Sequence, residues 1–151
     1  MRFNLGTATL AALLVVSGAA FAGKVNLENG IAIKGYDPVA YFTDQKPIKG
    51  VPEYAADYDG ATYEFVSAAH RVLFVETPEK YVPQFGGFCA YGTAQGHKPV
   101  IDPAAFTIVD GKLYLNYNSK VMTTWRQDIP GYIIKAERAW PKVSQQTDAS
   151  H

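Results

Sequence analysis

The hydrophobic pattern of the chain is clearest at two places where short runs of strand-forming residues flank an Asp-Gly pair. The two pairs are Asp59-Gly60 and Asp110-Gly111. Asp and Gly both tolerate the positive φ angles that a two-residue hairpin turn requires, so each pair predicts a tight β-hairpin. The strands predicted beside the turns are Tyr54 to Tyr58, Ala61 to Val66, Phe106 to Val109 and Lys112 to Tyr117.

Capping residues and helical spacing of apolar residues mark four further segments. We expect a proline just after a helix to end it, and a proline at the first helical position to support its start. Short hairpins that alternate with short helices predict an α+β fold, a small single domain of antiparallel hairpins packed with short helices. The predicted helices are Val39 to Phe42 after the Asp37-Pro38 cap, Ser67 to about Glu76 before Pro78, Lys120 to Gln127 after Ser119, and Gly131 to Trp140 before Pro141.

The first 22 residues have the pattern of a secretory signal peptide. Arg2 is followed by an apolar stretch and then by Ala20-Phe21-Ala22, which has small residues at both recognition positions of a cleavage site. The alternative is a membrane anchor, but Ser17 and Gly18 interrupt a run that is shorter than the ~20 residues of a span. We therefore expect an exported periplasmic protein with no membrane span after signal removal. Its domain would cover 23–142, followed by a polar tail over 143–151.

Composition excludes several classes of protein. The 151-residue chain has 14 basic and 14 acidic side chains, whereas a nucleic-acid-binding protein needs clustered Lys and Arg. Its single cysteine, Cys89, rules out an internal disulfide and zinc fingers built on two or more cysteines. Hydrolase and nucleotide-binding motifs such as Gly-x-Ser-x-Gly and the phosphate-binding loop do not occur.

The chemistry that remains is that of Cys89 and the histidines. Cys89 lies in a glycine-rich segment, where the glycines allow a tight turn or a close backbone approach. A reactive thiol needs its pKa lowered by a cation, a metal or a helix N-terminus, and no Lys or Arg is adjacent in the sequence. A buried, inert cysteine is the alternative. The segment reads Gly86-Gly87-Phe88-Cys89-Ala90-Tyr91-Gly92.

His70 is the second candidate, since it lies on the helix that follows Ser67. Histidine is the commonest metal ligand, although a lone histidine on a helix is usually a packed boundary residue. His97 lies in a turn-like loop and His151 is terminal, so both are expected to be solvated. Asp37 and Asp102 each precede a proline, which favours a capping role, although either carboxylate could also bind a metal or orient an imidazole.

Several separated motifs resemble the YHS domain family, in particular its longer, exported branch. The resemblance extends over residues 30 to 140. The motifs are Gly35-Tyr36-Asp37-Pro38-Val39-Ala40-Tyr41-Phe42, Tyr63-x-Phe65-x-Ser67-x-x-His70-x-x-x-Phe74, Pro78-Glu79-Lys80-Tyr81, Gly86-Gly87-Phe88-Cys89-Ala90-Tyr91, Asp110-Gly111-Lys112-Leu113-Tyr114-Leu115-Asn116-Tyr117 and the late Trp125.

Shorter YHS domains are thought to bind heavy metals through cysteines, and this chain departs from them at those positions. Ala40 stands where the first cysteine would fall, Val66 lies inside the second motif, and His70 stands where the last cysteine would fall. Only His70 could replace one of the lost ligands. Some members of the longer branch resemble selenoproteins with selenocysteine at the position of Cys89, which implies that this position carries chemistry. The family has no well-established reaction.

Three hypotheses follow. The first is a periplasmic soft-metal-binding protein, for copper or alternatively zinc, with Cys89 and His70 as central ligands, His97 or Asp37 as additional ones, and a metal-donor protein as partner. The second is a thiol redox enzyme in which Cys89 is catalytic without metal, His70 lowers its pKa, and a partner thiol completes the cycle. The third is a non-catalytic module that holds a small ligand or a protein with its tyrosines. Candidates for that role are Tyr36, Tyr41 and Tyr91.

Overall fold

A computed structural model of the chain describes residues 23–147. The predicted signal peptide and His151 lie outside these residues. Within this range, six α-helices and two small sheets confirm the predicted α+β fold. In chain order the elements are β1 (Leu27–Glu28), β2 (Ile31–Ala32), the 3-10 helix η2 (Ile33–Gly35), α1 (Ala40–Thr43), β3 (Val51–Tyr58), β4 (Ala61–Phe65), α2 (Ala68–Glu76), α3 (Pro78–Tyr81), the 3-10 helix η3 (Gln84–Gly87), α4 (Ala90–Ala94), β5 (Asp102–Val109), β6 (Lys112–Asn116), α5 (Ser119–Arg126) and α6 (Ile129–Val143).

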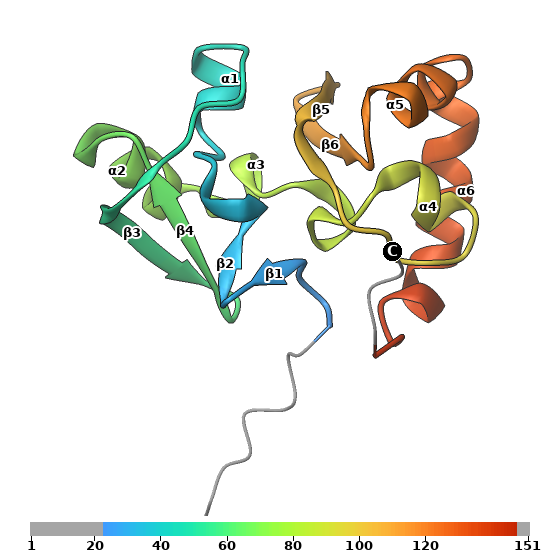
Figure 1. Ribbon diagram of the computed structural model, residues 1–151, viewed down its shortest axis with the longest axis horizontal. Helices are drawn as coiled ribbons and strands as arrows, with labels where there is room; N and C mark the ends of the chain where they lie inside the picture. Colours follow the sequence, from blue (N-terminus) through green and yellow to red (C-terminus); the bar gives the residue numbers. More distant parts are fainter. Residues whose placement is uncertain (1–22, 148–151) are drawn as a thin grey trace, which may run out of the picture.

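The larger sheet has the strand order β1-β2-β4-β3, and the smaller sheet pairs β5 with β6 (Figure 1). Both predicted hairpins are confirmed, because β3–β4 and β5–β6 pair antiparallel across their Asp-Gly turns. Asp59 and Asp110 adopt φ of 50°, and the glycines that follow them are also left-handed. The parallel pairing of β2 with β4, through Ile31 and Thr62, was not predicted.

Two of the helical predictions need correction. Asn118, not Ser119, caps α5, because its Oδ1 accepts a hydrogen bond from the Val121 N–H at 2.8 Å. Pro141 does not end the last helix, which runs on to Val143. A proline so close to the C-terminus removes little hydrogen bonding, and burial of Val143 in the core stabilises the extra turn. The helix capped by Ser67 ends at Glu76, as predicted.

Hydrogen bonds hold the end of the described chain in place, within the segment for which the sequence predicts a polar tail. The buried Lys98 ammonium donates hydrogen bonds to the carbonyl oxygens of Gly23, at 2.6 Å, and of Gln146. The Gln146 amide in turn donates to Gly96 O at 2.8 Å. Lys98 therefore ties the start of the described chain to its end.

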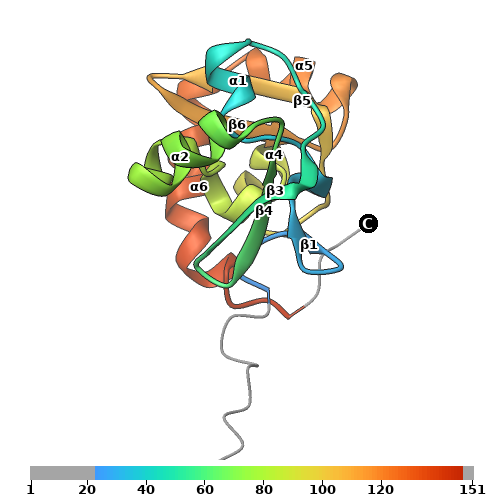
Figure 2. The same cartoon turned by 90° about the vertical axis from the view of Figure 1, so that its left-hand side faces the viewer.

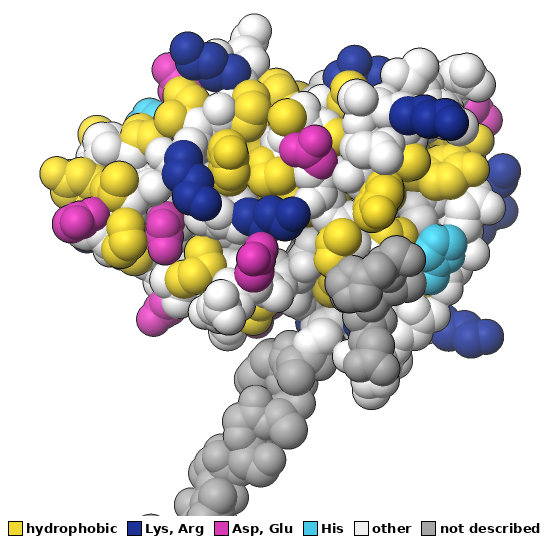
Figure 3. All heavy atoms as spheres, in the orientation of Figure 1, with side chains coloured by type: hydrophobic (Ala, Val, Ile, Leu, Met, Phe, Trp, Pro, Cys, Tyr) yellow, Lys and Arg dark blue, Asp and Glu magenta, His cyan; other side chains and the backbone are white. Residues whose placement is uncertain are grey.

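Apolar side chains from both sheets form one core, and a smaller cluster lies under the last helices. Figure 2 shows the chain from the side of β3 and β4, with α6 behind them. In Figure 1 the larger sheet and α2 occupy one side of the molecule, and β5, β6 and α4 to α6 occupy the other. On the face drawn in Figure 3, acidic and basic side chains are interspersed. The second cluster consists of Phe85, Ala90, Tyr114, Trp125 and Ala136.

Candidate functional site

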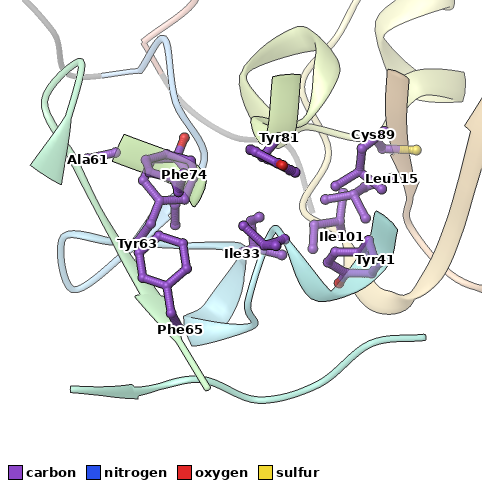
Figure 4. Packing of buried hydrophobic residues seen from close by; sticks show 13 residues of the cluster. Ile33, Tyr41, Ala61, Tyr63, Phe65, Phe74, Tyr81, Cys89, Ile101 and Leu115 are labelled. Carbon is purple, nitrogen blue, oxygen red and sulfur yellow. The ribbon is translucent and has the colours of Figure 1, made fainter. Parts of the chain in front are cut away.

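Cys89 lies at the junction of the core and a pocket. It follows η3 and caps α4, where its Sγ accepts a hydrogen bond from the Gly92 N–H at 3.4 Å. The residue is 0% exposed. Its sulfur nevertheless points away from the apolar side chains around it, as Figure 4 shows beside Tyr81 and Leu115. The core therefore holds the backbone and Cβ of Cys89, while the sulfur faces outward from the cluster.

The glycines around Cys89 serve close backbone packing, one of the two roles predicted for them. A Cβ on Gly86 would collide with Lys24 O, and Gly86 has a φ of +63°. A Cβ on Gly92 would collide with the Pro99 ring. The glycine-rich segment thus lets the chain at Lys24 approach Gly86 and lets the 97–99 loop approach Cys89, which is a structural explanation for the motif.

The approach of that loop creates a pocket of about 290 Å³ beside the sulfur. His97 is exposed, as predicted for a loop histidine, but it lines the same pocket as Cys89. The only thiol of the chain and one of its candidate imidazoles therefore line one pocket. The residues that line the pocket are Cys89, Tyr91, Gly92, His97, Pro99, Tyr117 and Val121.

Asn116, at the end of β6, is a site residue that the sequence analysis missed. It is fully buried, and its Oδ1 accepts hydrogen bonds from the Cys89 thiol at 3.5 Å and from the Tyr91 N–H at 3.1 Å. The backbone N–H of Tyr91 needs an acceptor, so Asn116 must turn its side-chain oxygen, and not its nitrogen, toward this N–H. The same oxygen then faces the sulfur of Cys89. The side-chain nitrogen of Asn116, Nδ2, has no hydrogen-bond partner among the described residues.

Burial raises the pKa of the Cys89 thiol, and this effect exceeds the opposing effect of backbone amides such as that of Gly92. The Asn116 oxygen also suits a protonated S–H, because it can only accept a hydrogen bond. The environment thus favours a neutral thiol in the metal-free protein. A thiol made reactive by a lowered pKa, as the redox hypothesis requires, does not match this environment.

His70 lies in a different place, on α2, and Figure 1 shows α2 and α4 on opposite sides of the molecule. Its ring contacts Asp37, through a 2.6 Å hydrogen bond from Nδ1 to Oδ2, and Thr43, whose Oγ1 is 3.5 Å from Nε2. The predicted pairing of Cys89 with His70 therefore has no support in the geometry. Instead, the structure joins His70 with Asp37.

Among the remaining candidates, Asp102 and Tyr41 have structural roles. Asp102 Oδ1 accepts a hydrogen bond from the Ala104 N–H at 2.9 Å, which is the predicted turn-capping role. Tyr41 is fully buried and donates its hydroxyl to Pro103 O at 2.7 Å, so it is part of the core, and it also lines a pocket with Phe42 and Phe106. Tyr36 lines a separate pocket, whereas Tyr91 lines the Cys89 pocket.

Within residues 23–147, no group of three or more His, Cys, Asp or Glu side chains is arranged to hold a metal ion. No helix in the same range is long and apolar enough to cross a membrane.

Comparisons with protein-family models, with curated proteins and with solved structures find no match to this chain. The resemblance to YHS domains thus stays a prediction that rests on the motifs alone.

Proposed function

We propose that this chain is an exported, periplasmic protein that binds one soft metal ion, copper(I), through Cys89 Sγ and His97. The observation that supports this is the pocket itself, which both residues line. Soft thiolate ligands favour copper(I), and imidazole also suits copper. Metal-donor proteins are the partners that such a site implies.

The surroundings of Cys89 fit a thiol that releases its proton only to a metal. Metal binding requires the thiolate, so the ion must displace the proton that Asn116 Oδ1 accepts in a hydrogen bond. The Gly92 N–H, 3.4 Å from Sγ, then stabilises the sulfur-centred charge. Zinc, the alternative metal, prefers four ligands, which two protein side chains do not supply.

Copper(I) titration without oxygen, in competition with a coloured copper(I) chelator, tests the proposal. We expect one tightly bound ion in the unmodified protein. Cys89→Ser should weaken binding by more than about 100-fold and His97→Gln by about tenfold, because each removes a ligand. His70→Gln is the matched control, since His70 lies outside the pocket, and it should leave the affinity unchanged. Equal affinities for the unmodified protein and Cys89→Ser would refute the proposal.

A second candidate is the binding of a small apolar ligand in the same pocket. Tyr91, Pro99 and Val121 give the pocket an apolar wall, and apolar lining with few polar groups is typical of ligand pockets. A screen of small aromatic fragments by NMR tests it. Shifts confined to residues around Tyr91 and Tyr117 would support this candidate, and the absence of such shifts would exclude it.

A further inference from the structure

A second pocket, of about 330 Å³, lies beside the turn that joins β3 to β4. Its lining comes from the first described residues, the β3–β4 hairpin, the segment from Val82 to Gly86 and the end of α6. None of its lining residues belongs to the pocket beside Cys89. The fold therefore leaves room for a small ligand at a place that the proposed copper site does not use.

Tyr63 lines this pocket with a side chain that is otherwise enclosed in the core. The residue is 3% exposed, and its ring packs on Phe74 with the two ring centroids 4.8 Å apart (Figure 4). Its hydroxyl forms no hydrogen bond with any of residues 23–147, although a buried tyrosine hydroxyl usually has a partner. Burial, and to a smaller extent the charge of Asp59, raises the pKa of Tyr63, so the hydroxyl keeps its proton. It can therefore both donate and accept a hydrogen bond.

Lys24 and Asp59 add one positive and one negative charge to the same lining. Both residues are exposed, and neither side chain forms an ion pair or a hydrogen bond within the part of the chain that the structure describes. A ligand with a net charge of either sign would meet one like charge here. The two side chains therefore favour a ligand that is neutral but can form several hydrogen bonds.

Two aromatic rings, of Trp140 and Tyr58, give the pocket its flat walls. The Trp140 ring contacts Phe85 and Phe88, with centroid distances of 6.0 and 6.4 Å, and the Tyr58 hydroxyl donates to Glu79 Oε1 at 3.0 Å. These contacts hold both rings in place before a ligand arrives. The C–H face of a sugar ring packs on such aromatic surfaces, whereas its hydroxyl groups need hydrogen-bond partners.

We propose that this pocket binds a small neutral carbohydrate, a mono- or disaccharide. Its ring would lie against Trp140 or Tyr58, and its hydroxyl groups would donate to the Asp59 carboxylate and accept from the Tyr63 hydroxyl and the Lys24 ammonium. The volume lies within the range of about 300–1,000 Å³ that is usual for small-ligand sites. Sugar binding and copper binding are independent proposals, because the two pockets share no residue.

NMR titration of the protein with D-glucose, D-galactose and maltose tests the proposal, with the indole N–H signal of Trp140 as the readout. We expect at least one of these sugars to shift this signal in a saturable way. L-Phenylalanine, a zwitterion with an aromatic side chain, should not shift it. The proposal would be overturned if none of the three sugars gave saturable shifts, or if L-phenylalanine bound more tightly than every sugar.

Two variants locate the binding. Tyr63→Phe should weaken sugar affinity about 3- to 10-fold, because it removes one hydrogen bond and keeps the ring that packs in the core. Asp59→Asn should weaken it about tenfold, because it removes a charged acceptor from a left-handed turn position that asparagine also tolerates.

Asp110→Asn is the matched control for Asp59→Asn, since Asp110 occupies the same turn position of the other hairpin, with the same φ of 50°, and does not line the pocket. It should change sugar affinity by less than about twofold, because a distant exposed charge is screened. Equal sugar affinities of Asp59→Asn and Asp110→Asn would place the sugar elsewhere and so contradict the assignment.

Discussion

Gly86→Ala tests the structural explanation of the segment before Cys89. A Cβ at this position would overlap Lys24 O and lie 3.0 Å from the Lys24 carbonyl carbon. Relief of the overlap requires the segment from Lys24 to Asn26 to move away. This would break the 2.8 Å hydrogen bond from Asn26 N–H to Gly86 O and the 3.2 Å bond from Asn26 Nδ2 to Gly87 O. These bonds contribute about 0.5–1.5 kcal/mol each. The left-handed φ of +63° adds about 1–2 kcal/mol for alanine.

The expected loss is therefore about 2–5 kcal/mol in the free energy of unfolding, measured by urea denaturation of the purified protein. Gly111→Ala is the matched control, since Gly111 also has a positive φ, of +73°, but no atom lies within 4 Å of its built Cβ. It should lose only the backbone component of about 1–2 kcal/mol. Equal losses for the two variants would show that close packing against Lys24 does not explain the glycine.

Three further predictions concern buried groups. Asp37→Ala should lower the free energy of unfolding by about 3–5 kcal/mol in urea denaturation, because it leaves buried N–H donors without an acceptor; a loss below about 1 kcal/mol would contradict this. Lys98→Met should speed amide hydrogen exchange at the end of α6, because it removes the hydrogen bonds from the Lys98 ammonium to Gly23 O and Gln146 O. Unchanged exchange rates would show that these hydrogen bonds do not hold the two ends of the described chain together. Iodoacetamide should alkylate Cys89 more slowly than free cysteine at pH 7, with a rate that rises only at alkaline pH because burial raises the pKa of the thiol; a midpoint below that of free cysteine would refute the reasoning.

The hairpins and the α2 helix could be predicted because their signals are local. Each Asp-Gly pair favours left-handed turn residues independently of tertiary contacts, as at Asp59-Gly60 and Asp110-Gly111. Ser67 likewise caps α2 through its own Oγ, which accepts the His70 N–H at 3.2 Å. Pro141 misled the prediction because the burial of Val143, a tertiary effect, outweighs the local preference.

The individual candidate residues could also be chosen from the sequence, but their partners could not. Cys89 was chosen for its residue type, whereas Asn116, its hydrogen-bond partner, is brought to it by the pairing of β6 in the fold. His97 looked like a solvated loop residue because nothing in the sequence shows that Pro99 packs on Gly92 and turns the loop toward the thiol. Spatial proximity of distant residues depends on packing, which a single sequence does not report.

The position of Asp37 gives a physical reason for two of the motifs that resemble YHS domains. Its carboxylate ties the Asp-Pro-Val-Ala segment to the Phe-x-Ser-x-x-His segment, through the amides of Ala40 and Val66 and the ring of His70. Here their N–H groups all donate to the Asp37 carboxylate, so these two motifs meet without a thiol. Copper(I) should therefore bind at Cys89, the only thiol in the sequence, before it binds at His70.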